Sequence, residues 1–181
     1  MPVSEETYRR VALEDPESKW ELHCGELRRK PGMTLEHNSV AWRIGFYLQQ
    51  QLPFDRYEVR LDSGRATRSP GEAYIPDVMV IPVELMAAHR GRPVVEAYGE
   101  PLPLVVEVWS PSTGEYDVDE KLPEYRRRGD IEIWRVHPYE RTITAWRRQV
   151  DGSYAESHHS GGTIEPASLP GVSIELASIF S

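Results

Sequence analysis

One apolar segment, residues 102–113, places an acidic side chain where a folded core does not normally accept one. The segment reads Leu-Pro-Leu-Val-Val-Glu-Val-Trp-Ser-Pro-Ser-Thr, and its apolar part predicts a core strand with Glu107 in the middle. An ionised carboxylate is costly to bury unless it is paired, hydrogen-bonded or bound to a metal ion. We therefore expect the rest of the chain to supply a partner for Glu107.

A second apolar segment, residues 74–82, also carries a lone carboxylate, Asp77. Because side chains alternate along a strand, Asp77 shares a face with Met79, and Glu107 shares a face with Val105. If the two strands are neighbours, the carboxylates converge and repel each other unless a proton or a cation lies between them. Two oxygen ligands on a rigid sheet suit Mg²⁺ or Mn²⁺, and such an ion can activate water and stabilise a phosphoryl transition state.

The segment after the Ser-Pro-Ser-Thr turn predicts a helix that ends at Gly129. Asp117 and Glu120 resemble a capping box at the start of this helix. A start at Asp119 would instead place Pro123 within the first turn, where proline costs less, so the sequence leaves both starts open.

Lys121 lies on this predicted helix, and its long side chain can reach back toward the edge of the sheet. A lysine beside a metal-bound water can orient the nucleophile or neutralise developing charge. A single lysine on a helix is usually solvated. The order of Asp77 after a proline, Glu107 in an apolar strand and Lys121 on the next helix is more specific than any of the three alone.

Periodicity predicts the other elements. Helical spacing predicts helices over residues 5–14, 34–52 and 83–89. Alternation and turn residues predict strands on both sides of Cys24-Gly25, near Tyr154, and over residues 56–62, 131–137 and 141–147. We expect loops from Gly64 to residue 73 and over residues 90–101. This order predicts an α/β (α+β) fold with a mixed sheet flanked by helices, in a single domain of residues 1–181 with a helical extension at residues 1–19.

The composition is that of an ordinary globular chain, because 39% of the 181 residues are hydrophobic and 28% are charged. The apolar runs fall short of the roughly 18–20 residues of a membrane span, and the N-terminus lacks a signal-peptide pattern. We therefore expect a cytoplasmic protein with no membrane partner. The single cysteine, Cys24, excludes an internal disulfide and a thiolate zinc cluster, and we interpret it as a small residue near a turn.

The net charge of −8 argues against non-specific binding to nucleic acid or to an anionic membrane. The positive residues are nevertheless clustered, at residues 28–30, 126–128 and 147–148. We interpret each cluster as a solvated face or as a partner for the C-terminal end of a helix. This clustering is compatible with a local basic groove on the surface.

Several of these segments together resemble one known family. The matching segments are residues 74–81 with Asp77, residues 104–113 with Glu107, and residues 117–138 with Lys121 and Gly129. The run Trp-Glu-Leu-His-Cys-Gly-Glu at residues 20–26, Glu36-His37, and the C-terminal residues 169–180 fit the same pattern. From about residue 20 to its end, the chain resembles the putative restriction endonuclease family, long filed as a domain of unknown function, within the PD-(D/E)XK nuclease superfamily.

The resemblance implies a restriction-endonuclease-like mixed sheet and a metal-dependent endonuclease that hydrolyses phosphodiester bonds in DNA. It implies that Asp77 and Glu107 bind Mg²⁺ or Mn²⁺ and that Lys121 is the catalytic lysine. Two positions depart from the pattern. Trp109 stands where the superfamily usually has its lysine, and His137 stands where the family often has an acid.

Some alternatives stay open. His37 could reach the site from the long helix as a supporting group, or could simply bond to backbone or solvent. The acidic net charge favours a non-catalytic binding or regulatory protein that keeps the nuclease fold. The residues Asp77, Glu107 and Lys121 could also form a buried ion-pair network with a structural role alone. A homodimer would suit duplex cleavage, which needs two cuts, but the sequence does not specify the DNA that is cut.

Overall fold

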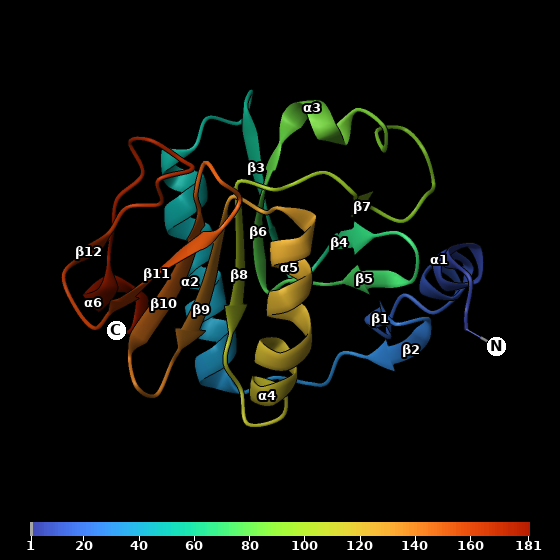
Figure 1. Cartoon of the computed structure of the whole chain (residues 1–181), viewed down its shortest axis with the longest axis horizontal. Helices are drawn as coiled ribbons and strands as arrows, with labels where there is room; N and C mark the ends of the chain where they lie inside the picture. The colour runs from blue at the N-terminus through green and yellow to red at the C-terminus, as the bar shows by residue number, and fades with distance from the viewer. Residues whose placement is uncertain (1) are drawn as a thin grey trace.

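The computed structural model describes residues 2–181 and has a six-stranded mixed sheet at its centre (Figure 1). Its strand order is β11-β10-β9-β8-β6-β3, with β8 and β9 parallel and the other neighbours antiparallel. The strands are β3 (Tyr57–Leu61), β6 (Val78–Pro82), β8 (Leu104–Val108), β9 (Glu132–His137), β10 (Thr142–Arg148) and β11 (Tyr154–His159). Every residue of β8 is buried, which explains its nearly continuous apolar sequence.

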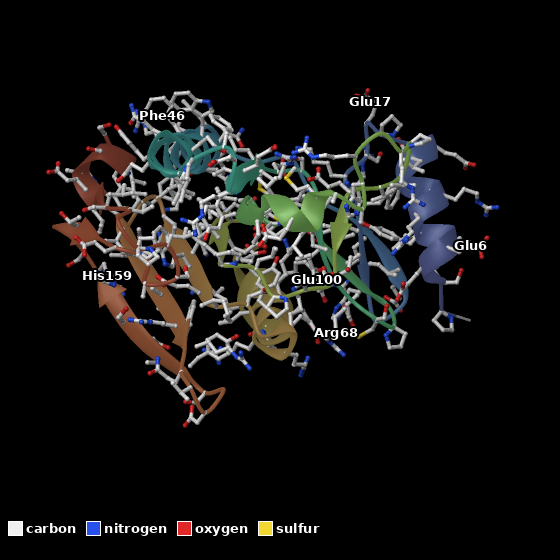
Figure 2. All side chains as sticks on the ribbon, turned by 90° about the horizontal axis from the view of Figure 1, so that it is seen from above. Glu6, Glu17, Phe46, Arg68, Glu100 and His159 are labelled. Atoms are coloured by element: carbon white, nitrogen blue, oxygen red, sulfur yellow. The ribbon has the colours of Figure 1, made fainter. Side chains whose placement is uncertain are left out.

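Two hydrophobic layers cover opposite faces of this sheet. Val78 packs in the layer that contains helix α2 (Leu35–Gln51), whereas Met79 packs in the layer that contains helix α5 (Leu122–Arg128). Figure 2, seen from above, shows the two helices on opposite sides of the strands. Burying an aliphatic side chain such as Ile44 of α2 contributes about 1.5–3 kcal/mol, so these layers hold the sheet in place.

A second, five-stranded sheet lies beside the first, in the order β2-β1-β5-β4-β7 (Figure 1). Its strands are β1 (Trp20–His23), β2 (Glu26–Arg29), β4 (Arg65–Arg68), β5 (Glu72–Tyr74) and β7 (Ala97–Tyr98). Helix α1 (Glu5–Glu14) packs Tyr8 and Ala12 against Leu22 of this sheet. Helix α1 and the C-terminal strands lie at opposite ends of the molecule, as the labels on Glu6 and His159 show in Figure 2.

A continuous helical segment follows β8. It consists of α4 (Gly114–Tyr116), a π-helical turn η1 (Asp117–Lys121) and α5. In η1 the Leu122 N–H bonds to the carbonyl of Asp117, one residue further away than in an α-helix. Pro123 follows directly, and because proline lacks an N–H and crowds the preceding turn, the wider π turn relieves the conflict.

The start of this segment corrects the sequence prediction. The helix begins at Gly114, before both predicted starts. Asp117 therefore lies inside the helix, and the predicted capping box of Asp117 and Glu120 is wrong because no side chain caps η1. The predicted end is confirmed, since Gly129 adopts the left-handed conformation (φ 81°) that caps α5.

The remaining elements are α3 (Val83–Met86), the paired strands β12 (Thr163–Ile164) and β13 (Ile174–Glu175), and α6 (Leu176–Ile179). Ile164, Ile174 and Ile179 pack in the hydrophobic layer of α2, so the C-terminal segment docks on the core as predicted. In the described part of the chain, the helices are too short or too polar to cross a membrane.

The predicted mixed sheet with flanking helices is confirmed, but three predicted strand and loop boundaries are wrong, because the loop expected over residues 90–101 contains β7 and two further segments differ. The predicted strand over residues 74–82 is divided between β5 in the small sheet and β6 in the large one. Asp77 therefore precedes β6 instead of lying within a strand. Residues 65–68, expected in a loop, form β4 because they pair with β5.

Candidate active site

Asp77 and Glu107 come from neighbouring strands of the large sheet. The antiparallel register of β6 and β8 aligns Val78 with Val106. The same register places Asp77, the residue before β6, beside Glu107, and Asp77 Oδ2 accepts a hydrogen bond from the Val108 N–H at 2.7 Å. The structure therefore brings the two acids together, as the alternation of side chains predicts.

Asp77 is buried, and its carboxylate contacts Lys30, His37 and the Val108 N–H, which come from three different parts of the chain. Lys30 Nζ lies 2.7 Å from Asp77 Oδ1, and His37 Nε2 lies 3.0 Å from Asp77 Oδ2. Lys30 also donates to the Ile75 carbonyl at 2.8 Å, which fixes its side chain. His37 thus reaches Asp77 from the first turn of α2, in the supporting position that the sequence left open.

Glu107 is held by a different set of partners. Its Oε1 accepts a hydrogen bond from the Tyr125 hydroxyl at 2.5 Å and lies 3.3 Å from Lys121 Nζ. The second oxygen, Oε2, lies 3.5 Å from the same nitrogen. Tyr125 follows Lys121 by one helical turn, so both side chains reach Glu107 from one face of the helical segment. The structure therefore places the third predicted residue, Lys121, against the second.

Two further carboxylates lie beside Lys121: Glu21, which the sequence did not single out, and Asp117, for which it predicted only a capping role. Glu21 Oε1 lies 3.0 Å from Lys121 Nζ and also accepts the Ile75 N–H at 2.8 Å. Asp117 Oδ1 lies 3.5 Å from Lys121 Nζ, while the Thr113 hydroxyl donates to Asp117 Oδ2 at 2.9 Å. Carboxylates thus outnumber lysines around the candidate site in the described chain.

The two predicted acids have opposite pKa shifts. Burial alone would raise the pKa of Asp77, but the charge of Lys30 and the hydrogen bond of His37 outweigh it and hold the pKa well below its usual range. Burial raises the pKa of Glu107 well above its usual range, because the charge of Lys121 offsets it only in part and Asp77 adds repulsion. Asp77 is therefore ionised, whereas Glu107 favours a proton or an additional cation.

Lys121 carries a firmly held positive charge. Burial alone would lower the pKa of Lys121, but the charges of Glu107, Glu21 and Asp117 outweigh it and raise the pKa well above its usual range. The Lys121 side chain is consequently a charged ammonium group that donates hydrogen bonds. A protonated amine of this kind does not act as a general base.

Trp109 and His137, the two residues that depart from the family pattern, contact each other. The Trp109 and His137 rings stack with centroids 4.4 Å apart. Trp109 also lies so close to Gly114 that an added Cβ there would collide with the indole ring. Trp109 therefore covers the start of the helical segment.

Two surface pockets flank the buried cluster. One is lined by the turn after β8 and by the start of the helical segment, including Trp109, Ser110 and Asp119. The other is lined by Lys19, Arg29 and Lys30, with other residues. Because Lys30 lines this second pocket and contacts Asp77, the pocket adjoins the candidate site.

The fold is shared with a solved structure. A crystal structure described as a putative nuclease belonging to DUF820 from Anabaena variabilis ATCC 29413 matches this chain with a TM-score of 0.73 and 15% sequence identity. The match covers 89% of each chain. At this identity the likeness establishes the fold, a mixed sheet core with flanking helices.

The family follows from the sequence. Residues 5–177 match Uma2, the family described as putative restriction endonuclease, and the chain therefore belongs to this family. No curated protein matches the sequence. The family resemblance and the fold class predicted from the sequence are confirmed. The catalytic roles of Asp77, Glu107 and Lys121 stay predictions.

Proposed function

We propose that this chain is a metal-dependent endonuclease that hydrolyses phosphodiester bonds in DNA. The observation that carries the proposal is the placement of Asp77 and Glu107 side by side, with Lys121 Nζ 3.3 Å from Glu107 Oε1. Membership of the Uma2 family supports it, because that family is described as putative restriction endonuclease.

The donor set fits a hard divalent cation. Carboxylate oxygens suit Mg²⁺ or Mn²⁺. Among the described residues, Asp77 Oδ1 accepts one hydrogen bond, from Lys30, and the buried Asp117 Oδ1 accepts none. The surplus of carboxylates leaves negative charge that a divalent ion would balance. We infer that Asp77 and Glu107 hold the ion, which would supply water activation and stabilisation of phosphoryl charge.

The side chains around the two acids have complementary roles in this proposal. Lys121 neutralises negative charge that develops on the phosphate, because its raised pKa keeps it protonated. His37 and Lys30 fix the orientation of Asp77, and Tyr125 fixes that of Glu107. Each ligand is thereby held before the substrate arrives, which lowers the cost of reaching the reactive geometry.

DNA would approach through the pocket lined by Lys19, Arg29 and Lys30. These three basic side chains line the pocket together with the acids Glu17 and Asp62, and Asp62 pairs with Lys19 and Lys30, in a chain whose net charge is −8. A phosphate bound there would lie next to the Lys30–Asp77 contact. Cutting both strands of a duplex would require two such sites, and a twofold homodimer would supply them.

Cleavage of supercoiled plasmid and branched DNA tests the proposal. Wild type is compared with Asp77→Asn, Lys121→Ala and the exposed control Glu84→Gln, each with Mg²⁺ or Mn²⁺. We expect cleavage by wild type and by the control. The two site variants should lose about 100-fold to 1,000-fold in rate, because each removes a preorganised charge. Absence of cleavage under every condition, or equal cleavage by all four proteins, would refute the proposal.

The burial of the site favours one alternative function, a non-catalytic binding or regulatory protein that keeps the nuclease fold. Asp77, Glu107 and Lys121 are only 2%, 4% and 1% exposed. This alternative predicts that DNA binding survives Glu107→Gln and that divalent ions leave the melting temperature unchanged. A rise in melting temperature with Mg²⁺ or Mn²⁺ would count against it, since a ligand that prefers the native state stabilises that state.

A further inference from the structure

Outside the candidate active site, three metal-ligating side chains of different chemistry meet at the end of the β1–β2 hairpin. His23 ends β1, Cys24 lies in the turn and Glu72 begins β5. The pairing of β1 with β5, visible in Figure 1, brings the three together. One ligand atom from each residue lies within 4.8 Å of the other two.

Glu72 approaches each of the other two ligands at a distance found between neighbouring ligands of a tetrahedral site, although it uses a different oxygen for each. His23 Nδ1 lies 3.3 Å from Glu72 Oε2, and Cys24 Sγ lies 3.5 Å from Glu72 Oε1. Zinc bonds of about 2.0 Å to nitrogen or oxygen and about 2.3 Å to sulfur place neighbouring ligands roughly 3.3–3.6 Å apart. An ion bound to all three residues would be held by a Glu72 carboxylate that binds through both oxygens or turns to present one.

Supporting groups already orient the histidine and the glutamate. His23 Nε2 lies 3.0 Å from Glu120 Oε2, which favours a hydrogen on Nε2 and holds the ring with Nδ1 directed at Glu72. The Tyr74 hydroxyl donates to Glu72 Oε2 at 2.6 Å and accepts from His23 Nδ1 at 2.6 Å, so an ion would displace the Nδ1 hydrogen and replace this contact. The Cys24 N–H donates to Glu72 Oε1 at 3.1 Å. A carboxylate behind a histidine is the usual outer arrangement of a zinc ligand.

We propose that His23, Cys24 and Glu72 bind one Zn²⁺ ion, with Glu120 as the positioning residue behind His23. A mixed set of nitrogen, sulfur and oxygen donors suits Zn²⁺ and is unsuited to Mg²⁺. Cys24 is exposed, so the fourth position faces solvent and takes a water. The single cysteine excludes a zinc cluster built from several thiolates, but a mixed site needs only one.

The proposed zinc site adjoins the candidate active site without sharing a ligand with it. Glu21, two residues before His23 on β1, contacts Lys121 Nζ at 3.0 Å. Glu120 directly precedes Lys121 in the helical segment. An ion bound at His23 would therefore fix β1 relative to the segment that carries Lys121. This inference does not depend on the proposed nuclease function.

Zinc titration of the metal-free full-length chain tests the site. One variant, Cys24→Ser, removes a proposed zinc ligand at an exposed turn. The control variant, Asp77→Asn, alters the candidate active site and leaves the proposed zinc ligands in place. Wild type and Asp77→Asn should each bind one Zn²⁺, with a rise in melting temperature, and Cys24→Ser should lose this binding. With Co²⁺ in place of Zn²⁺, wild type should show a thiolate-to-cobalt band in the near ultraviolet that Cys24→Ser lacks.

A matched pair of acid variants tests the positioning role of Glu120. Glu120→Gln should weaken Zn²⁺ binding by about 10-fold to 100-fold, as expected when the group behind a histidine ligand is altered. Glu26→Gln, an exposed acid on the same hairpin, should leave Zn²⁺ binding unchanged. The proposal is overturned if wild type binds no Zn²⁺, if Cys24→Ser binds it equally well, or if the cobalt band is absent.

Discussion

The two halves of the buried charged cluster differ in how their charges are balanced. In the Asp77 half, Asp77 meets Lys30, His37 and the Val108 N–H, and the second carboxylate on Lys30, that of the partly exposed Asp62, is also paired with Lys19. In the Glu107 half, Lys121 alone supplies the positive charge for three carboxylates, those of Glu107, Glu21 and Asp117, among the described residues.

This difference shows that the Glu107 half has too little positive charge for its carboxylates. The pKa of Asp77 is lowered because its partners favour the ionised form, whereas the pKa of Glu107 is raised because burial and neighbouring acids favour the protonated form. A cation shared by the two acids would remove this asymmetry. The comparison thus supports the proposed divalent ion on physical grounds that are independent of the family description.

The largest difference between the two halves should appear in the free energy of unfolding when each lysine is replaced in turn. Lys121→Ala leaves three buried carboxylates with no ammonium group, so we expect the free energy of unfolding to fall by about 3–5 kcal/mol. Lys30→Ala leaves Asp77 with His37 and the Val108 N–H, so we expect a loss of about 1.5–3 kcal/mol. Urea denaturation at neutral pH measures both. Equal losses would contradict the comparison.

The halves should also respond to pH in opposite directions. Because the pKa of folded Asp77 lies below the ordinary value of 3.8, its contribution to stability is present above pH 3.8 and is lost as the pH falls below it. Because the pKa of folded Glu107 lies above the ordinary value of 4.5, its contribution favours the folded state below pH 4.5 and is lost as the pH rises above it.

Unfolding of charge-neutral variants across pH 2–8 checks these signs. Relative to wild type, Asp77→Asn should flatten the loss of stability in acid, and Glu107→Gln should flatten the loss above pH 4.5. Each effect should reach about 1.4 kcal/mol per pH unit at most. The exposed control Glu84→Gln should follow wild type. Parallel curves for Asp77→Asn and Glu107→Gln would mean that the assigned asymmetry is wrong.

The smallest expected effect is at His37. His37→Asn removes one hydrogen bond to the charged Asp77 but leaves Lys30 in place, so we expect a loss of about 1.5 kcal/mol in the free energy of unfolding. His158→Asn, on the exposed strand β11, should change it little. If the two histidine variants are equally stable, the His37–Asp77 contact does not support the site.

The sequence contained enough information to predict that Asp77, Glu107 and Lys121 lie together, with His37 as a candidate beside them, but not that Glu21 and Lys30 contact them. Alternation in the two apolar strands predicted that Asp77 and Glu107 share a face, and both lie in the buried cluster. Glu21 sits in a short strand with no distinguishing pattern. Lys30 ends a basic run that we interpreted as solvated, yet it is buried against Asp77. Their burial depends on how the small sheet packs against the large one, which local patterns do not encode.

The same reasoning explains the errors in secondary structure. Residues 65–68 form β4 only because they pair with β5 and β7, a tertiary condition. The start of the helical segment was ambiguous because Pro123 argued against a regular α-helix. A π turn resolves the conflict, and such turns are too rare to expect from a single sequence.

The most direct test of the central claim is calorimetric titration of Mn²⁺ into the chain, in a Cys24→Ser background that removes the proposed zinc site. If Asp77 and Glu107 share one ion, Mn²⁺ should bind with a stoichiometry of one. The single variants Asp77→Asn and Glu107→Gln should each abolish this binding. Mn²⁺ binding that persists in either variant would contradict a shared ion.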